Sequence, residues 1–220
     1  MGWSYSSLKT FQQCPKKYYH LKVTKDVENV GGAAADYGKK FHEAAEFYIR
    51  DGKPLPKEFK FAEKTLDTLN KIPGKKYCEI ELGIIKNKQG KYISCKFDDP
   101  NHWWHGIADL LIVDGGAAYL VDYKTSKNAK YADTKQLDLL AAGVFLAFPM
   151  VLEIKSALAF VISNEFVTKE HHSFYKEDYM HVMKPELDRL EAAMANKVWN
   201  PVSGPLCKFC PVTSCAHHKG

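Results

Sequence analysis

Apolar residues recur at helical spacing in five parts of the chain. Between residues 36 and 50 they gather on one stripe of a helix, which holds Phe41, Ala44, Ala45 and Tyr48. The same periodicity predicts four further helices, at 3–21, 57–71, 132–148 and 176–197. Segments rich in small or turn-forming residues predict two loops, at 29–38 and 198–220.

Alternation of apolar and polar residues predicts the strands. The strands that flank a tight turn within 106–124 are the clearest, because two apolar runs lie on either side of it. Further strands are predicted at 77–85, 91–97, 156–163 and 165–174. The order of helices, hairpins, helix, strands and helix favours a mixed sheet flanked by helices, which is an α/β or α+β layered fold.

The turn at 114–117, of sequence DGGA, sets the register of the strands around it. Counting back along both strands, Asp109 faces Asp122, and Lys124 projects from the same face as Asp122. Two carboxylates directly opposite each other repel and destabilise a sheet. Both also lie inside apolar runs, where a charge without a partner is costly.

A divalent cation would remove this repulsion. Asp109 and Asp122 can both supply oxygen ligands to Mg²⁺ or Mn²⁺. Lys124 can then orient or help deprotonate a water molecule on the metal, or neutralise charge on a phosphate. These groups predict hydrolysis of a phosphodiester, and the competing interpretation is an ordinary polar strand face. Glu79 and Glu81 share a strand face near this site. We expect that face to be exposed to solvent, and the alternative is that the two carboxylates contact the metal shell.

Length and charge limit the class of protein. The 220 residues fit one domain, 1–220, with a core of about 30–197 and ends at 1–21 and 198–220. No apolar run is as long as a membrane span and no signal peptide opens the chain, so we expect no membrane partner and a cytoplasmic location. A net charge of +5 permits nucleic-acid binding without requiring it.

Lysine dominates the positive charge. Of 31 basic residues only Arg50 and Arg189 are arginine. Because lysine acts as a point charge and arginine reads base edges, a nucleic-acid partner would be held mainly through its phosphates. An AT-rich genome would explain the same bias.

Six cysteines without a signal peptide indicate metal or thiol chemistry and argue against disulfides. Three of them have metal-ligand spacing, Cys207-x2-Cys210-x4-Cys215. Cys14 is the best candidate for a fourth ligand, and a local zinc site could use His217 or His218 in its place. The other two, Cys78 and Cys95, are expected to be buried core thiols.

Four motifs in order resemble those of the PD-(D/E)XK nucleases, in particular RecB-type exonuclease domains. Along the chain they are the GKKFH segment that ends at His42, Gly106-x-x-Asp109, Asp122-Tyr123-Lys124, and Gln136. The resemblance implies a restriction-endonuclease-like core with Mg²⁺ or Mn²⁺ held by His42, Asp109, Asp122 and the carbonyl of Tyr123. It also implies that Lys124 is catalytic and that Gln136 positions the substrate or the lysine. Leu140 stands where the family usually has an aromatic residue.

The cysteines resemble those of the iron–sulfur subgroup, which includes AddB-type and CRISPR-associated adaptation nucleases. There, one N-terminal and three C-terminal cysteines hold a [4Fe–4S] cluster. The resemblance therefore implies a structural cluster on Cys14, Cys207, Cys210 and Cys215 that joins the chain ends, with Zn²⁺ as the competing metal.

The peptide 14–20, CPKKYYH, combines charge and aromatic rings beside the proposed cluster. Lys16 and Lys17 could contact phosphates while Tyr18 stacks on a base. The alternative is a packed helix with a solvated basic face.

The resemblance implies a metal-dependent DNA exonuclease that acts on single-stranded DNA or on DNA with free ends. It would serve DNA repair or recombination in a bacterial or phage-infected cell, beside recombination or replication proteins. The main rival is a non-catalytic DNA-binding or recombination accessory protein that retains the nuclease fold. An iron–sulfur redox protein is a third reading, which the lack of a flavin or nicotinamide fingerprint disfavours.

Overall fold

The computed structural model describes residues 2–28, 31–130 and 132–219. Within this part the chain divides into two compact units. The first contains Gly2 and residues 33–182, and the second contains residues 3–32 and 183–219 apart from 29 and 30. The single-domain organisation expected from the sequence stays a prediction.

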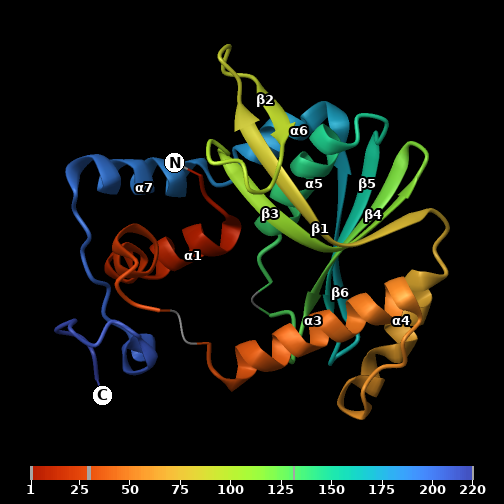
Figure 1. Cartoon of the computed structure of the whole chain (residues 1–220), viewed down its shortest axis with the longest axis horizontal. Coiled ribbons are helices and arrows are strands. Elements are labelled where there is room, and N and C mark those ends of the chain that lie inside the picture. The colour runs from red at the N-terminus through yellow and green to blue at the C-terminus, as the bar shows by residue number, and fades with distance from the viewer. Residues whose placement is uncertain (1, 29–30, 131, 220) are drawn as a thin grey trace. The chain divides into compact units, whose positions relative to one another are not determined.

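A mixed six-stranded sheet forms the centre of the first unit (Figure 1). Its strand order is β2-β1-β3-β4-β5-β6. The strands are β1 (Lys75–Lys86), β2 (Tyr92–Cys95), β3 (Trp104–Asp114), β4 (Ala117–Lys124), β5 (Glu153–Phe160) and β6 (Glu165–His172). Only the β4 and β5 pair is parallel; the other neighbours are antiparallel. The predicted strands and the mixed α/β fold are confirmed, and this architecture is consistent with a restriction-endonuclease-like core.

The predicted register of the β3–β4 hairpin is also confirmed. Asp114 pairs with Ala117 and Leu110 pairs with Val121. Gly115 takes a left-handed φ of 58°, which a two-residue hairpin turn requires and which glycine adopts without strain. The turn therefore sets which side chains meet at the far end of the hairpin.

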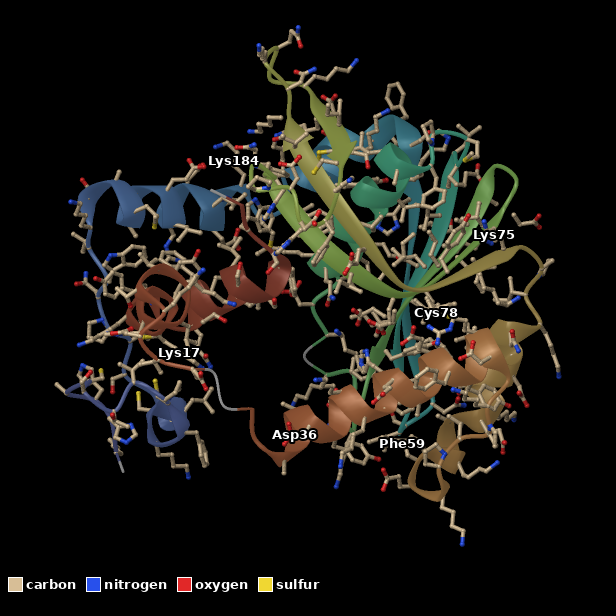
Figure 2. All side chains as sticks on the ribbon, in the orientation of Figure 1. Lys17, Asp36, Phe59, Lys75, Cys78 and Lys184 are labelled. Carbon is tan, nitrogen blue, oxygen red and sulfur yellow. The ribbon has the colours of Figure 1, made fainter. Side chains whose placement is uncertain are left out.

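Helical segments complete the first unit. They are α3 (Ala33–Asp51), the 3₁₀ helix η2 (Lys57–Ala62), α4 (Glu63–Asn70), α5 (Lys135–Ala147), the 3₁₀ helix η3 (Ser173–Tyr175) and α6 (Lys176–Met180). One core joins α3, η2 and α4 to the sheet through buried residues that include Phe41, Phe59, Leu66, Leu110 and Tyr123. Figure 2 labels Phe59, and also Cys78, which packs against this core.

The predictions for 29–38 and for 176–197 are wrong in part. The loop predicted at 29–38 is helical from Ala33 onward, because three consecutive alanines are strong helix formers, while residues 29 and 30 lie outside the described residues. The helix predicted at 176–197 is two helices, α6 and α7 (Lys184–Asn196). Pro185 is the reason, since proline is tolerated in the first turn of a helix and not in its interior.

The second unit combines the two ends of the chain. Its elements are α1 (Tyr5–Gln13), α2 (Pro15–Tyr18), the π-helix η1 (Tyr19–Thr24), α7 and the 3₁₀ helix η4 (Pro205–Phe209). Ser4 caps α1 through a reciprocal pair of hydrogen bonds with Ser7. Pro15 opens α2 and so divides the helix predicted at 3–21 at Cys14. No helix in the described residues has both the length and the apolar composition needed to cross a membrane.

Candidate active site

Two buried carboxylates meet where β3 and β4 pair. Asp109 is 7% exposed and Asp122 is 3% exposed. The pairing of Leu110 with Val121 puts the two aspartates opposite each other in the continuing register. The backbone N–H of Tyr123 donates to Asp109 Oδ2 at 2.6 Å, which satisfies one lone pair of that carboxylate. The arrangement that the turn predicts is thus present, and its charge needs further partners.

Lys124 and Gln136 supply partners to Asp122. The Lys124 ammonium lies 2.5 Å from Asp122 Oδ2. Gln136, from the first turn of α5, donates through Nε2 to Asp122 Oδ1 at 2.6 Å and accepts from Lys124 Nζ at 3.0 Å. The amide therefore bridges the acid and the ammonium and fixes the direction of both.

His42 reaches the same place from α3. Its Nδ1 lies 3.2 Å from Asp109 Oδ1 and 3.9 Å from a Glu79 carboxylate oxygen. One ligand atom from each of His42, Glu79 and Asp109 fits within 4.8 Å of the other two. Asp122 lies outside this group of three, with its oxygens directed to Lys124 and Gln136.

Glu79 corrects the expectation of a solvent-exposed strand face. On β1 its neighbours Cys78 and Ile80 pair with Leu110 and Ala108, so Glu79 stands across from Asp109. Its backbone has a left-handed φ of 48°, which is rare for a residue with a side chain and is tolerated mostly at functional sites. The sequence offered Glu79 only as the less favoured alternative to a solvated strand face, because β1–β3 pairing is non-local and no turn specifies that register.

The carboxylates perturb one another. Burial, then the charge of Asp109, raises the pKa of Glu79 to about 7, opposed by His42. Burial and Asp109 also raise the pKa of Asp122, while Lys124 acts to lower it. Burial alone would lower the pKa of His42, but its hydrogen bond to Asp109 and the surrounding carboxylates raise it above its ordinary value. The site holds more negative charge than it can stabilise on its own.

These donors fit a divalent cation. Carboxylate oxygens and an imidazole nitrogen suit Mg²⁺ or Mn²⁺. Asp122 Oδ2 is buried and accepts no well-directed hydrogen bond, although the Lys124 ammonium lies near it. Tyr123 is buried between Asp122 and Lys124, with its ring against Phe41, and a ligand role for its carbonyl stays a prediction.

Two residues of the motifs have a packing role. A Cβ at Gly106 would lie 2.6 Å from the Trp104 ring, so only glycine fits there. Leu140, which replaces the aromatic residue expected in α5, is 2% exposed and would lie 3.3 Å from the same Cβ. This contact requires an apolar side chain, and Leu140 cannot stack on a base.

The four predicted cluster cysteines line one cavity of about 230 Å³ in the second unit, together with His217 and His218. Cys14 Sγ accepts from the Val202 N–H at 3.4 Å. Among the described residues no three of these sulfur and nitrogen atoms lie within 4.8 Å of one another. The expectation that Cys78 and Cys95 are fully buried is wrong, because both are half-buried at the sheet.

The prediction that Tyr18 stacks on a base is wrong, because the ring is buried in the folded chain. Tyr18 is 1% exposed, stacks on Trp199 at 6.1 Å and meets Phe11 edge-on, within the second unit. Burial raises its pKa to about 12. Lys16 and Lys17 are half-buried, and the Lys17 ammonium donates to Gln13 at 3.1 Å. Contacts of these lysines with phosphates stay a prediction.

Comparisons with known proteins give a family and similar folds. The chain is similar to a solved structure described as "Putative exonuclease" from Eubacterium rectale, with 16% identity, a TM-score of 0.52, and coverage of 94% of this chain and 86% of that one. It also matches the crystal structure of SSO0001, with 15% identity, a TM-score of 0.49, and coverage of 100% and 88%. No curated protein sequence matches the chain significantly. A family model matches residues 2–215, and the chain therefore belongs to the PD-(D/E)XK nuclease superfamily.

Proposed function

We propose that this protein is a single nuclease domain that requires Mg²⁺ or Mn²⁺ and hydrolyses phosphodiester bonds of DNA. Its substrate is single-stranded DNA or DNA with free ends. This proposal rests on the mutual contacts of Asp122, Lys124 and Gln136, which lie beside Asp109. A binding module gains nothing from a buried acidic pair that is costly to fold. The solved fold neighbour described as an exonuclease supports degradation from an end.

The roles of the residues follow from their contacts. His42, Glu79 and Asp109 would hold the cation. Asp122 and the Tyr123 carbonyl would complete the ligands, as the resemblance to the family implies. A bound divalent cation supplies Lewis-acid activation of the phosphate and lowers the pKa of water. Lys124 positions the attacking water with its ammonium, and Gln136 holds that ammonium in place through its amide oxygen.

The test uses end-labelled linear single-stranded DNA and a circular counterpart, each with Mg²⁺ or Mn²⁺. Lys124→Ala removes the catalytic ammonium, and Lys127→Ala removes the same charge from an exposed residue three positions further on. We expect the linear strand to be degraded, the circle to survive, Lys124→Ala to be inactive and Lys127→Ala to match the wild type. Cutting of both substrates would refute the requirement for an end. Cutting of neither by metal-loaded protein would favour the accessory DNA-binding reading.

We also propose that the cysteine cavity holds a structural [4Fe–4S] cluster, as in the iron–sulfur subgroup. A tetrahedral zinc site needs sulfur atoms about 3.8 Å apart, given Zn–S bonds of about 2.3 Å. The lining of one cavity by all four cysteines supports a bound metal group there, and the choice of the cluster over zinc rests on the resemblance alone. By joining the chain ends, the cluster would stabilise the fold by about 4–5 kcal/mol on the loop-closure model.

Anaerobic purification followed by assay of iron, acid-labile sulfide and zinc tests the cluster. Cys215→Ser should lose iron and sulfide and unfold at a lower temperature. Cys95→Ser, which changes a half-buried cysteine outside the cavity, should retain both. Stoichiometric zinc without sulfide would refute the cluster and leave the nuclease proposal untouched. Recombination or replication partners stay a prediction.

A further inference from the structure

Residues 86–96, which contain the end of β1, the loop after it and β2, form a basic segment in the same unit as the candidate active site. Figure 1 shows its loop projecting from the sheet. Between residues 86 and 96 the chain has no acidic residue and four exposed lysines, Lys86, Lys88, Lys91 and Lys96. The net charge of the whole protein is +5, so this one hairpin has a large share of the excess.

The charge of these lysines is not neutralised by neighbouring acids. In the part of the chain that the structure describes, none of the four has a carboxylate within ion-pair distance, whereas Lys60 pairs with Glu63 and Lys155 with Glu170. Four ammonium groups without counter-charges attract an anion to this surface.

The loop between the strands is also held in one conformation. The Asn87 side-chain oxygen accepts from the backbone N–H groups of Gln89 and Lys91, at 3.0 and 2.9 Å. Gly90 supplies the left-handed residue that the turn needs, with φ of 77°. Little conformational entropy is therefore lost when the backbone of this loop meets a ligand.

Two half-exposed aromatic rings stand beside the lysines. Tyr92 and Trp103 have ring centroids 4.7 Å apart and planes tilted by 57°. The Lys86 ammonium lies 4.9 Å from the Tyr92 centroid and 5.2 Å from the Trp103 centroid. His181 approaches the Tyr92 hydroxyl at 3.4 Å. Aromatic rings among lysines suit the bases and phosphates of a single strand.

We propose that the β1–β2 hairpin is a sequence-independent binding surface for single-stranded DNA, separate from the active site; the choice of ligand rests on the proposed function. Lys88 and Lys91 contact phosphates, and Tyr92 stacks on a base. Glu79 precedes Lys86 by seven positions on β1, so the active site lies within about 23 Å of the hairpin. A stacked strand with about 3.4 Å per nucleotide covers that distance in about seven nucleotides.

Binding is measured without cleavage, by fluorescence anisotropy of a labelled single strand in EDTA over a series of salt concentrations. Lys88→Gln/Lys91→Gln should weaken binding and reduce the slope of log affinity against log salt by about 1.4, since each phosphate contact with a single strand contributes about 0.7. The matched control, Lys60→Gln/Lys155→Gln, removes equal charge from lysines that already have acidic partners and should leave the slope unchanged.

The ring is tested separately. Tyr92→Leu should weaken binding about tenfold, near the lower part of the range for a base stacked on an aromatic ring, and Tyr92→Phe should bind as the wild type does. If Tyr92→Leu has no effect, the surface recognises charge alone and the proposal is overturned.

Cleavage in the presence of metal separates this inference from the proposed function. At limiting substrate, Lys88→Gln/Lys91→Gln should degrade a single strand of twice the estimated span of about seven nucleotides more slowly than the wild type does. It should cleave a dinucleotide at the wild-type rate. Equal rates on the long strand would overturn the hairpin proposal while the nuclease stands. Hairpin-dependent binding without any cleavage would refute the nuclease and retain the binding surface.

Discussion

Replacing Glu79 with glutamine should stabilise the metal-free protein, which is the reverse of the usual effect of changing a residue in an active site. Glu79 shares its site with Asp109 and Asp122, and burial and their charges raise its pKa from 4.5 to about 7. Ionisation of Glu79 in the folded state is therefore unfavourable whenever no cation is present. Glutamine keeps the shape and the backbone strain of this position and removes only the charge.

The magnitude follows from the pKa. A pKa of about 7 in place of 4.5 corresponds to about 3.4 kcal/mol of lost stability at pH 8. Because 33% of the Glu79 side chain is exposed, screening by solvent reduces this figure, and we expect about 1–2 kcal/mol.

The dependence on pH has a definite sign. The folded state binds the Glu79 proton more tightly than the unfolded state, so the free energy of unfolding of the wild type falls as pH rises from 4.5 to about 7. Below that window both forms of residue 79 are neutral. Glu79→Gln should therefore match the wild type at pH 4 and exceed it at pH 8.

Urea unfolding in EDTA at pH 4 and pH 8 measures the difference, followed by the same experiment with Mn²⁺ at pH 8. With Mn²⁺ the order should reverse, because Glu79→Gln has lost a candidate ligand. Glu81→Gln is the matched control: it lies two positions along β1, is exposed, and should change stability by less than about 0.5 kcal/mol. The reasoning fails if Glu79→Gln is less stable than the wild type in EDTA at pH 8, or if its gain is the same at both pH values.

Three further changes have definite expected outcomes. Gln136→Ala should lower kcat about 100-fold with little change in KM, since the Lys124 ammonium loses its orienting amide. Steady-state degradation of a labelled strand checks this, and a rise in KM as large as the fall in kcat would contradict it. Gly106→Ala should cost about 1–3 kcal/mol in urea unfolding, because its Cβ would lie 2.6 Å from the Trp104 ring, and a neutral result would show that the ring can move. Asp138→Asn should cost about 1–3 kcal/mol in the same assay, because the buried Asp138 carboxylate accepts from Lys169 Nζ at 2.7 Å and lies 3.0 Å from His171 Nε2. A loss below about 0.5 kcal/mol would show that these charged contacts contribute little.

Part of the candidate site could be predicted because its causes lie close together in the chain. The turn at 114–117 is a local feature, and the period of two along a strand carries its register to Asp109 and Asp122. The position of Gln136 in the first turn of α5 also follows from a local helical pattern. The spacing of Cys207, Cys210 and Cys215 is equally local.

Other parts were decided only by tertiary structure. Glu79 faces Asp109 because β1 pairs with β3, and no local turn or alternation specifies that register; its left-handed backbone even breaks the alternation that the prediction used. Tyr18 is buried because Trp199, from the other end of the chain, stacks on it. Local pattern and turn chemistry determine elements and the pairs within a hairpin, since these interactions span few residues. Pairing between distant strands and the burial of a given ring depend on long-range packing, where a favourable contact must first offset the entropy of closing a long loop.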